Sequence, residues 1–129
     1  MLTGRVTGER EAVVQVQVLG PEGQVRLVEA TIDTGYNGFL TLPAPLIRDL
    51  TLPFAGAARA TLGDGNEVKL DLFLATVVWE KEPCEVLVLA AEGGVLLGMA
   101  MLVGSRVTLD VEDDGAITIE ALATVRSVH

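Results

Sequence analysis

The sequence predicts an all-β fold, a closed β-barrel or sandwich of short antiparallel hairpins with one short helix near the C-terminal part. Two observations support this prediction. Runs of β-branched or alternating apolar residues are short, and turn residues separate them throughout the chain. Hydrophobic residues make up 50% of the composition and aromatic residues only 4%, which predicts an aliphatic core. A length of 129 residues fits one domain, residues 1–129.

The N-terminal part predicts a β-hairpin over residues 12–32. Residues 14–18 read Val-Gln-Val-Gln-Val, which is the two-residue period of a strand with one buried face. Residues 20–23, Gly-Pro-Glu-Gly, supply the turn, and residues 24–32 form the return strand.

Turn signals place the remaining elements. The clearest hairpin pairs residues 58–62 with residues 67–73, because Asp64-Gly65 supplies the positive-φ positions that a tight turn needs. The other predicted elements are, in chain order, a helical turn at 44–50, strands at 74–80 and 85–91, a buried strand at 95–98, a helix at 99–103, and a hairpin of 106–111 with 116–119.

Charge and hydropathy exclude several classes of protein. The formal net charge is −9 and the nine Lys and Arg are scattered, so we expect no binding to nucleic acid or to anionic membranes. The first residues lack an apolar signal core, and the apolar runs are too short to span a bilayer. A single cysteine allows no intrachain disulfide. We therefore expect a soluble cytoplasmic protein.

Few residues suit catalysis other than by carboxylates. His129 is the only histidine, which removes Ser-His and Cys-His catalysis and most zinc sites. Cys84 is interpreted as a half-buried strand residue, because no base is available to activate it. The acidic clusters at 80–85 and 112–114 are interpreted as solvated surface charge rather than a cation site. We expect neither a metal nor a cofactor.

The chemistry is expected at Asp33-Thr34-Gly35. An apolar strand delivers the Asp33 carboxylate directly into a turn, Gly35 permits close approach of another segment, and the Thr34 hydroxyl can bond across an interface. Asp, Thr and Gly are also common turn residues after a strand, so the tripeptide alone is a weak motif.

Three landmarks in order resemble the retropepsin-like aspartic proteases of clan AA. An apolar-apolar-Asp-Thr/Ser-Gly loop is present at residues 31–35, and an apolar-apolar-Gly signature before a helix is present at Leu96-Leu97-Gly98. Between them, the hairpin with Asp64-Gly65 at its tip occupies the position of that family's flap. Together the landmarks cover roughly residues 12–120, which makes the set more specific than any one of them.

The likeness is greatest to the small bacterial branch of that family. Residues 33–40 are similar to its extended loop, with the Asn37-Gly38 pair and following apolar residues. The chain departs from the viral enzymes at Tyr36, where they usually carry Ala or Ser.

The resemblance implies an aspartic endopeptidase, a hydrolase that cleaves extended segments of a peptide or protein substrate. The chain has one such loop, so Asp33 of two chains would meet around a water at the twofold axis of a homodimer. Thr34 would form a cross-dimer hydrogen bond, Gly35 would allow the close approach, and residues 117–122 are expected to contribute to the interface.

The resemblance also assigns supporting residues. Tyr36, Asn37, Asp64 and Gly65 are expected to contact the substrate. The third landmark, Leu96-Leu97-Gly98, is expected to pack behind the Asp33 loop and to stabilise it.

Two other functions are open from the sequence. One is a catalytically inactive dimer of the same fold that acts as a peptide-binding or assembly module, since fold does not establish function. The other is a β-barrel ligand carrier in which Asp33 faces solvent away from any twofold axis.

Overall fold

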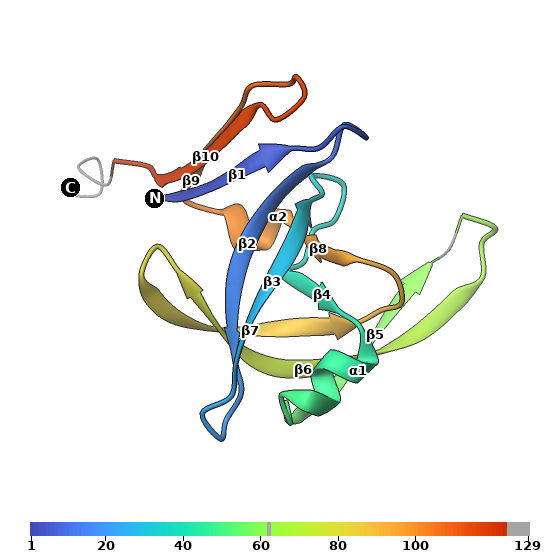
Figure 1. Cartoon of the computed structure of the whole chain (residues 1–129). Helices are drawn as coiled ribbons and strands as arrows, with labels where there is room; N and C mark the ends of the chain where they lie inside the picture. Colours follow the sequence, from blue (N-terminus) through green and yellow to red (C-terminus); the bar gives the residue numbers. More distant parts are fainter. Residues whose placement is uncertain (62, 124–129) are drawn as a thin grey trace, which may run out of the picture.

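The computed structural model describes residues 1–61 and 63–123 and shows an all-β fold (Figure 1). Over these residues the chain forms ten strands and two short helices. In chain order they are β1 (Leu2–Val6), β2 (Ala12–Leu19), β3 (Val25–Ile32), β4 (Leu40–Leu42), α1 (Ala44–Asp49), β5 (Phe54–Thr61), β6 (Glu67–Trp79), β7 (Glu82–Ala90), β8 (Val95–Leu97), α2 (Met99–Leu102), β9 (Ser105–Leu109) and β10 (Ala116–Ala121).

The strands form one sheet that closes on itself. Its order is β5-β6-β7-β4-β8-β3-β2-β1-β10-β9, and β6 pairs in addition with β2. That pairing closes β2, β3, β8, β4, β7 and β6 into a barrel of six strands. The predicted closed all-β barrel is confirmed.

Most of the predicted hairpins are confirmed. In β2 the side chains of Val14, Val16 and Val18 are buried, as the alternation predicts, and β2 pairs with β3 in antiparallel register. The turn between them places Gly23 at φ +86°, a conformation that glycine adopts without strain. Both helical turns form close to the predicted positions, so the fold has two short helices rather than one.

The prediction of separate strands at 67–73 and 74–80 is wrong, because β6 runs without interruption over 13 residues. Residues 72–79 contain no Gly, Pro, Asn or Asp, so no turn residue stops the strand near Phe73 and Leu74. Its first part pairs with β5 in the projecting hairpin, and its second part pairs with β7 and β2 in the barrel. The hairpin is therefore a direct extension of a barrel strand (Figure 1).

Two short strands were not predicted. The first, β1, contains Gly4 between two polar residues, and it forms because β2 and β10 offer pairing edges on both sides of it. The second, β4, has three residues, all buried. These two strands follow from tertiary pairing rather than from a sequence pattern.

The barrel positions the loop after β3 through an inserted strand. The inserted strand β8 lies between β3, to which it is parallel, and β4, to which it is antiparallel at Leu40 and Leu97. Thr41, buried in β4, accepts a hydrogen bond from the Leu96 N–H at 2.8 Å and donates one to the Gly94 carbonyl at 3.4 Å. Residues 33–39, the Asp33 loop, must therefore pass around the end of β8.

The core is aliphatic, as predicted. It joins the valines of β2 to Leu40, Leu97 and the buried pair Ile117 and Ile119 of β10. Both edges of β10 are paired, one with β1 and the other with β9. The outer edge in this region is therefore that of β9.

Replacing Leu40 tests this core. Leu40 is 1% exposed and lies between β7 and β8, so we expect Leu40→Ala to lower the free energy of unfolding by about 2–5 kcal/mol through loss of burial and formation of a cavity. Leu27→Ala is the matched control, because Leu27 is 63% exposed. We expect this substitution to change the free energy of unfolding by less than about 0.5 kcal/mol. Denaturation at one fixed protein concentration, followed by circular dichroism, measures both variants. Equal losses in the two would contradict the assignment of the core.

Candidate active site

Asp33 stands at the end of β3 as the first residue of a tight turn. The Tyr36 N–H donates to the Asp33 carbonyl at 3.1 Å, and this bond closes the turn with Thr34 and Gly35 at its centre. The Gly35 N–H donates to Asp33 Oδ1 at 2.9 Å and fixes the orientation of the half-buried carboxylate. Among the described residues, Oδ2 has no hydrogen-bond partner, so this oxygen is open to a water or a ligand.

Hydrogen bonds to the segment after β8 hold the Asp33 loop in place. The Asp33 N–H donates to the Leu97 carbonyl at 2.9 Å, and the Gly98 N–H donates to the Phe39 carbonyl at 3.0 Å. At the start of α2 the Met99 N–H donates to the Tyr36 carbonyl at 2.8 Å. Leu97 is fully buried and Leu96 half-buried, so the third sequence landmark lies directly behind the loop, where it was expected.

Gly98 is required by this packing. A Cβ at Gly98 would collide with the Gly38 carbonyl oxygen and would lie 2.5 Å from Cδ2 of the Tyr36 ring. A Cβ at Gly38 would lie 2.5 Å from Cζ of the same ring. The Tyr36 ring therefore occupies the space that two absent side chains leave, and burial raises the pKa of its phenol above 10.0. The phenol stays neutral at physiological pH.

The other predicted residues of the loop face outward. Thr34, Gly35 and Asn37 are exposed. In this single chain the Thr34 side chain therefore lies on the surface of the loop, which is the position that a contact with a second chain requires.

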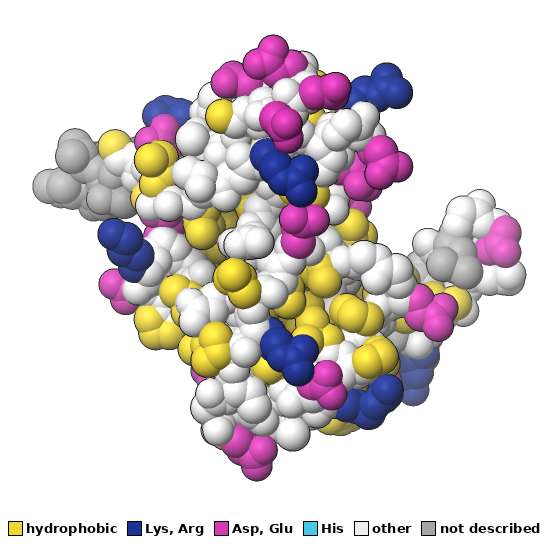
Figure 2. Space-filling view, in the orientation of Figure 1, with side chains coloured by type: hydrophobic (Ala, Val, Ile, Leu, Met, Phe, Trp, Pro, Cys, Tyr) yellow, Lys and Arg dark blue, Asp and Glu magenta, His cyan; other side chains and the backbone are white. Residues whose placement is uncertain are grey.

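A cleft of about 720 Å³ separates the Asp33 loop from the projecting hairpin of β5 and β6. We call it the hairpin cleft; residues 35–38, residues 58–61 of β5, Leu70 and Leu72 of β6, and Leu89 of β7 line it. Figure 2 shows the tip of the hairpin standing apart from the body of the molecule, with a hollow between them. Asp33 does not itself line the hairpin cleft, but Gly35 and Tyr36 of the same tight turn form part of its wall.

The predicted contact residues Asp64 and Gly65 are located at the exposed tip of the hairpin and outside the cleft lining. Both Asp64 oxygens bond within the turn, Oδ1 to the Asn66 N–H at 2.9 Å and Oδ2 to the Asn66 amide at 3.0 Å. Gly65 has φ +88°. Within this chain the turn itself explains both residues, and their contact with substrate stays a prediction.

Sequence reasoning missed the residues on the inner face of the hairpin. Ala58 and Ala60 face Leu70 and Val68 across the two strands, and these side chains are half-buried whereas their neighbours along each strand are exposed. Alternation at 58–60 and 68–72 was visible in the sequence and would have identified this face.

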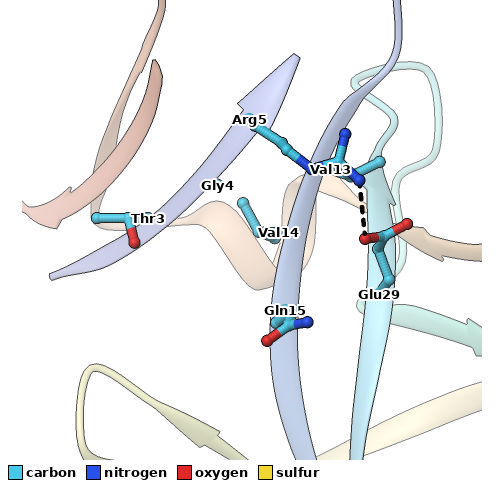
Figure 3. Close-up of a pocket in the computed structure, with 7 residues that line it drawn as sticks. All are labelled: Thr3, Gly4, Arg5, Val13, Val14, Gln15 and Glu29. Atoms are coloured by element: carbon cyan, nitrogen blue, oxygen red, sulfur yellow. Dashed lines mark ion pairs between the residues drawn. The ribbon is translucent and has the colours of Figure 1, made fainter. Parts of the chain in front are cut away.

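A second depression, of about 250 Å³, lies where β1 crosses β2 (Figure 3). Its ionisable side chains are Arg5 and Glu29, which form a half-exposed ion pair at 3.6 Å. Exposed ion pairs of this kind contribute little energy and carry no reactive group. The hairpin cleft is the stronger candidate because a carboxylate with a fixed orientation stands beside it.

Other candidate chemistry finds no support within residues 1–61 and 63–123. No group of three His, Cys, Asp or Glu side chains there could hold a metal ion. Cys84 is exposed rather than half-buried, and His129 lies outside the described residues. No helix in the described part of the chain has the length and apolar composition that crossing a membrane requires.

No model of a protein family matches the chain, and no curated protein matches its sequence.

Gly98→Ala tests the packing behind the Asp33 loop. The added methyl group meets the Gly38 backbone, which cannot rotate away, so we expect a loss of about 1–3 kcal/mol in the free energy of unfolding. Gly94→Ala is the matched control, because among the described residues a Cβ there meets nothing within 4 Å beyond its chain neighbours. Chemical denaturation compares the two. A neutral Gly98→Ala would show that the loop is not packed against this glycine.

Proposed function

We propose that this chain is an aspartic endopeptidase that acts as a homodimer, with Asp33 of each chain activating one water. The observation that carries the proposal is the place of Asp33. Its carboxylate has one oxygen fixed by the Gly35 N–H and stands beside a cleft large enough for a peptide segment. The order of loop, hairpin and Leu96-Leu97-Gly98 resembles the retropepsin-like proteases and supports the same function.

A second copy supplies what one chain lacks. The chain has a single Asp-Thr-Gly turn; Asp110, Asp113 and Asp114 are exposed at the far hairpin of β9 and β10. Met99, the first residue of α2 and bonded to the Asp33 loop through its N–H, is 44% exposed, and Val103, directly after α2, is 81% exposed. Apolar side chains this exposed favour contact with another protein surface. Because Ile117 and Ile119 are fully buried inside the chain, these two cannot contribute side chains to that contact.

The reaction follows from two carboxyl groups that share a proton because both cannot ionise cheaply at close range; the aspartic-protease pair is a standard example of such coupling. The ionised group takes a proton from the water, whose oxygen bonds to the peptide carbonyl carbon. The protonated group gives its proton to the carbonyl oxygen. When the tetrahedral intermediate collapses, the C–N bond breaks and the nitrogen leaves with the proton taken from the water. One hydroxyl of the intermediate returns its proton to the carboxylate that had given one, which re-forms the carbonyl and restores the shared proton.

Asp33→Asn tests the catalytic assignment. The amide cannot accept the proton of the water, so we expect cleavage of unstructured peptides to fall by at least about 100-fold, the lower range for loss of a general base. Asp113→Asn is the matched control, since Asp113 is exposed in the turn between β9 and β10 and has no assigned role in the site. Cleavage is followed by mass spectrometry of the products, and the dimer is checked by sedimentation.

The outcomes of that experiment separate the alternatives. Full cleavage by the Asp33→Asn variant would refute the proposal. Peptides that bind to the wild-type dimer without being cleaved from mildly acidic to neutral pH would identify the binding or assembly module.

Val103→Glu tests the dimer. A carboxylate forced into an apolar contact loses its hydration, so we expect the dimer dissociation constant to rise by about 10-fold or more. The rate of cleavage should fall because less dimer is present, and it should recover at higher protein concentration. Val25→Glu is the matched control, because Val25 is 53% exposed and begins β3 at the end away from Asp33. Unchanged sedimentation and activity in Val103→Glu would show that the second copy binds elsewhere.

A further inference from the structure

Tyr36 lines the hairpin cleft, and its ring packs against backbone atoms of the Asp33 loop and of the segment after β8. It extends from Gly98, near Cδ2, to Gly38, near Cζ and the hydroxyl, and it contacts the backbone that those two glycines leave uncovered. Backbone atoms held by the Gly98 and Met99 hydrogen bonds cannot retreat from the ring. The ring is therefore unable to move toward the loop when a ligand presses on it from the cleft.

The opposite wall has small side chains. Ala58 and Ala60 of β5 line the cleft with Leu70 and Leu72 of β6, and Arg59 and Thr61 add two polar side chains to this wall. Phe54, at the start of β5, stacks edge to face on Phe73 with ring centres 5.7 Å apart and is absent from the cleft lining. The aromatic ring in the cleft is thus that of Tyr36, on the side of Asp33.

We propose that the Tyr36 ring limits the size of the substrate side chain that binds in the hairpin cleft beside Asp33, so that small and aliphatic residues are accepted and aromatic residues are rejected. The inference rests on the proposed peptidase function and adds a substrate class to it. Two observations carry it: backbone atoms that cannot retreat support the Tyr36 ring, and this ring is the one aromatic side chain among the described residues that line the cleft.

The test is a set of matched peptides cleaved by the wild-type dimer and by Tyr36 variants. The peptides differ only at the residue on each side of the cleaved bond, which is Ala, Leu, Phe or Trp. In Tyr36→Ala we expect the ratio of kcat/KM for Phe to that for Ala to rise by about 10-fold or more, since hydrophobic pockets discriminate to this degree. Tyr36→Phe keeps the ring and should keep the wild-type ratio.

A second variant, Tyr36→Leu, tests the same inference if Tyr36→Ala fails to fold. Tyr36→Leu retains apolar contact with Gly38 and Gly98 while shortening the wall, so it should admit Phe but still reject Trp. Each variant is checked by circular dichroism and by its kcat/KM for the Ala peptide.

The possible failures are distinct. A wild-type dimer that cleaves none of the peptides refutes the proposed function, and this inference with it. A wild-type dimer that cleaves them, with the same size preference in Tyr36→Ala and Tyr36→Leu, overturns the inference alone. An increased ratio in Tyr36→Phe would assign the selection to the hydroxyl and would overturn it as well.

Discussion

The insertion of β8 between β3 and β4 is the constraint on which the candidate site depends. Two strands that follow each other in the chain are held apart by a third, so the connection between them becomes a loop with a fixed path. The backbone at Leu97, Gly98 and Met99 then exchanges hydrogen bonds with that loop. A carboxylate on a free surface turn would sample many positions; here the barrel closure determines where the Asp33 carboxylate lies.

The same closure determines the other side of the cleft. One strand, β6, pairs with β2 to complete the barrel and, at its other end, with β5 to form the hairpin. Loop and hairpin therefore belong to one hydrogen-bonded framework, and the cleft width is set by barrel geometry rather than by contact across the cleft. At Gly56, which has φ +129°, the register of β5 against β6 shifts where the hairpin leaves the barrel.

The sequence predicted the elements with strong local signals. Alternation in residues 14–18 and the Asp64-Gly65 turn led to the correct hairpins, and short apolar runs separated by turn residues led to the correct fold class. Pairing between distant segments was not predictable: β1 and β4 are short and depend on neighbours far along the chain. At the site, the motif located Asp33 and the glycine behind it, but it favoured the hairpin tip over the hairpin's inner face. Turn residues are conspicuous in a sequence, whereas a row of alanines is not.

The chain contains one tyrosine and one tryptophan, and the fold places them apart. Tyr36 forms the wall of the cleft, whereas Trp79 ends β6 at the turn into β7, at the opposite end of that strand from the hairpin tip. Fluorescence from the indole therefore reports on a region of the molecule away from the cleft. It can monitor the integrity of the barrel while a ligand occupies the cleft, without any attached label.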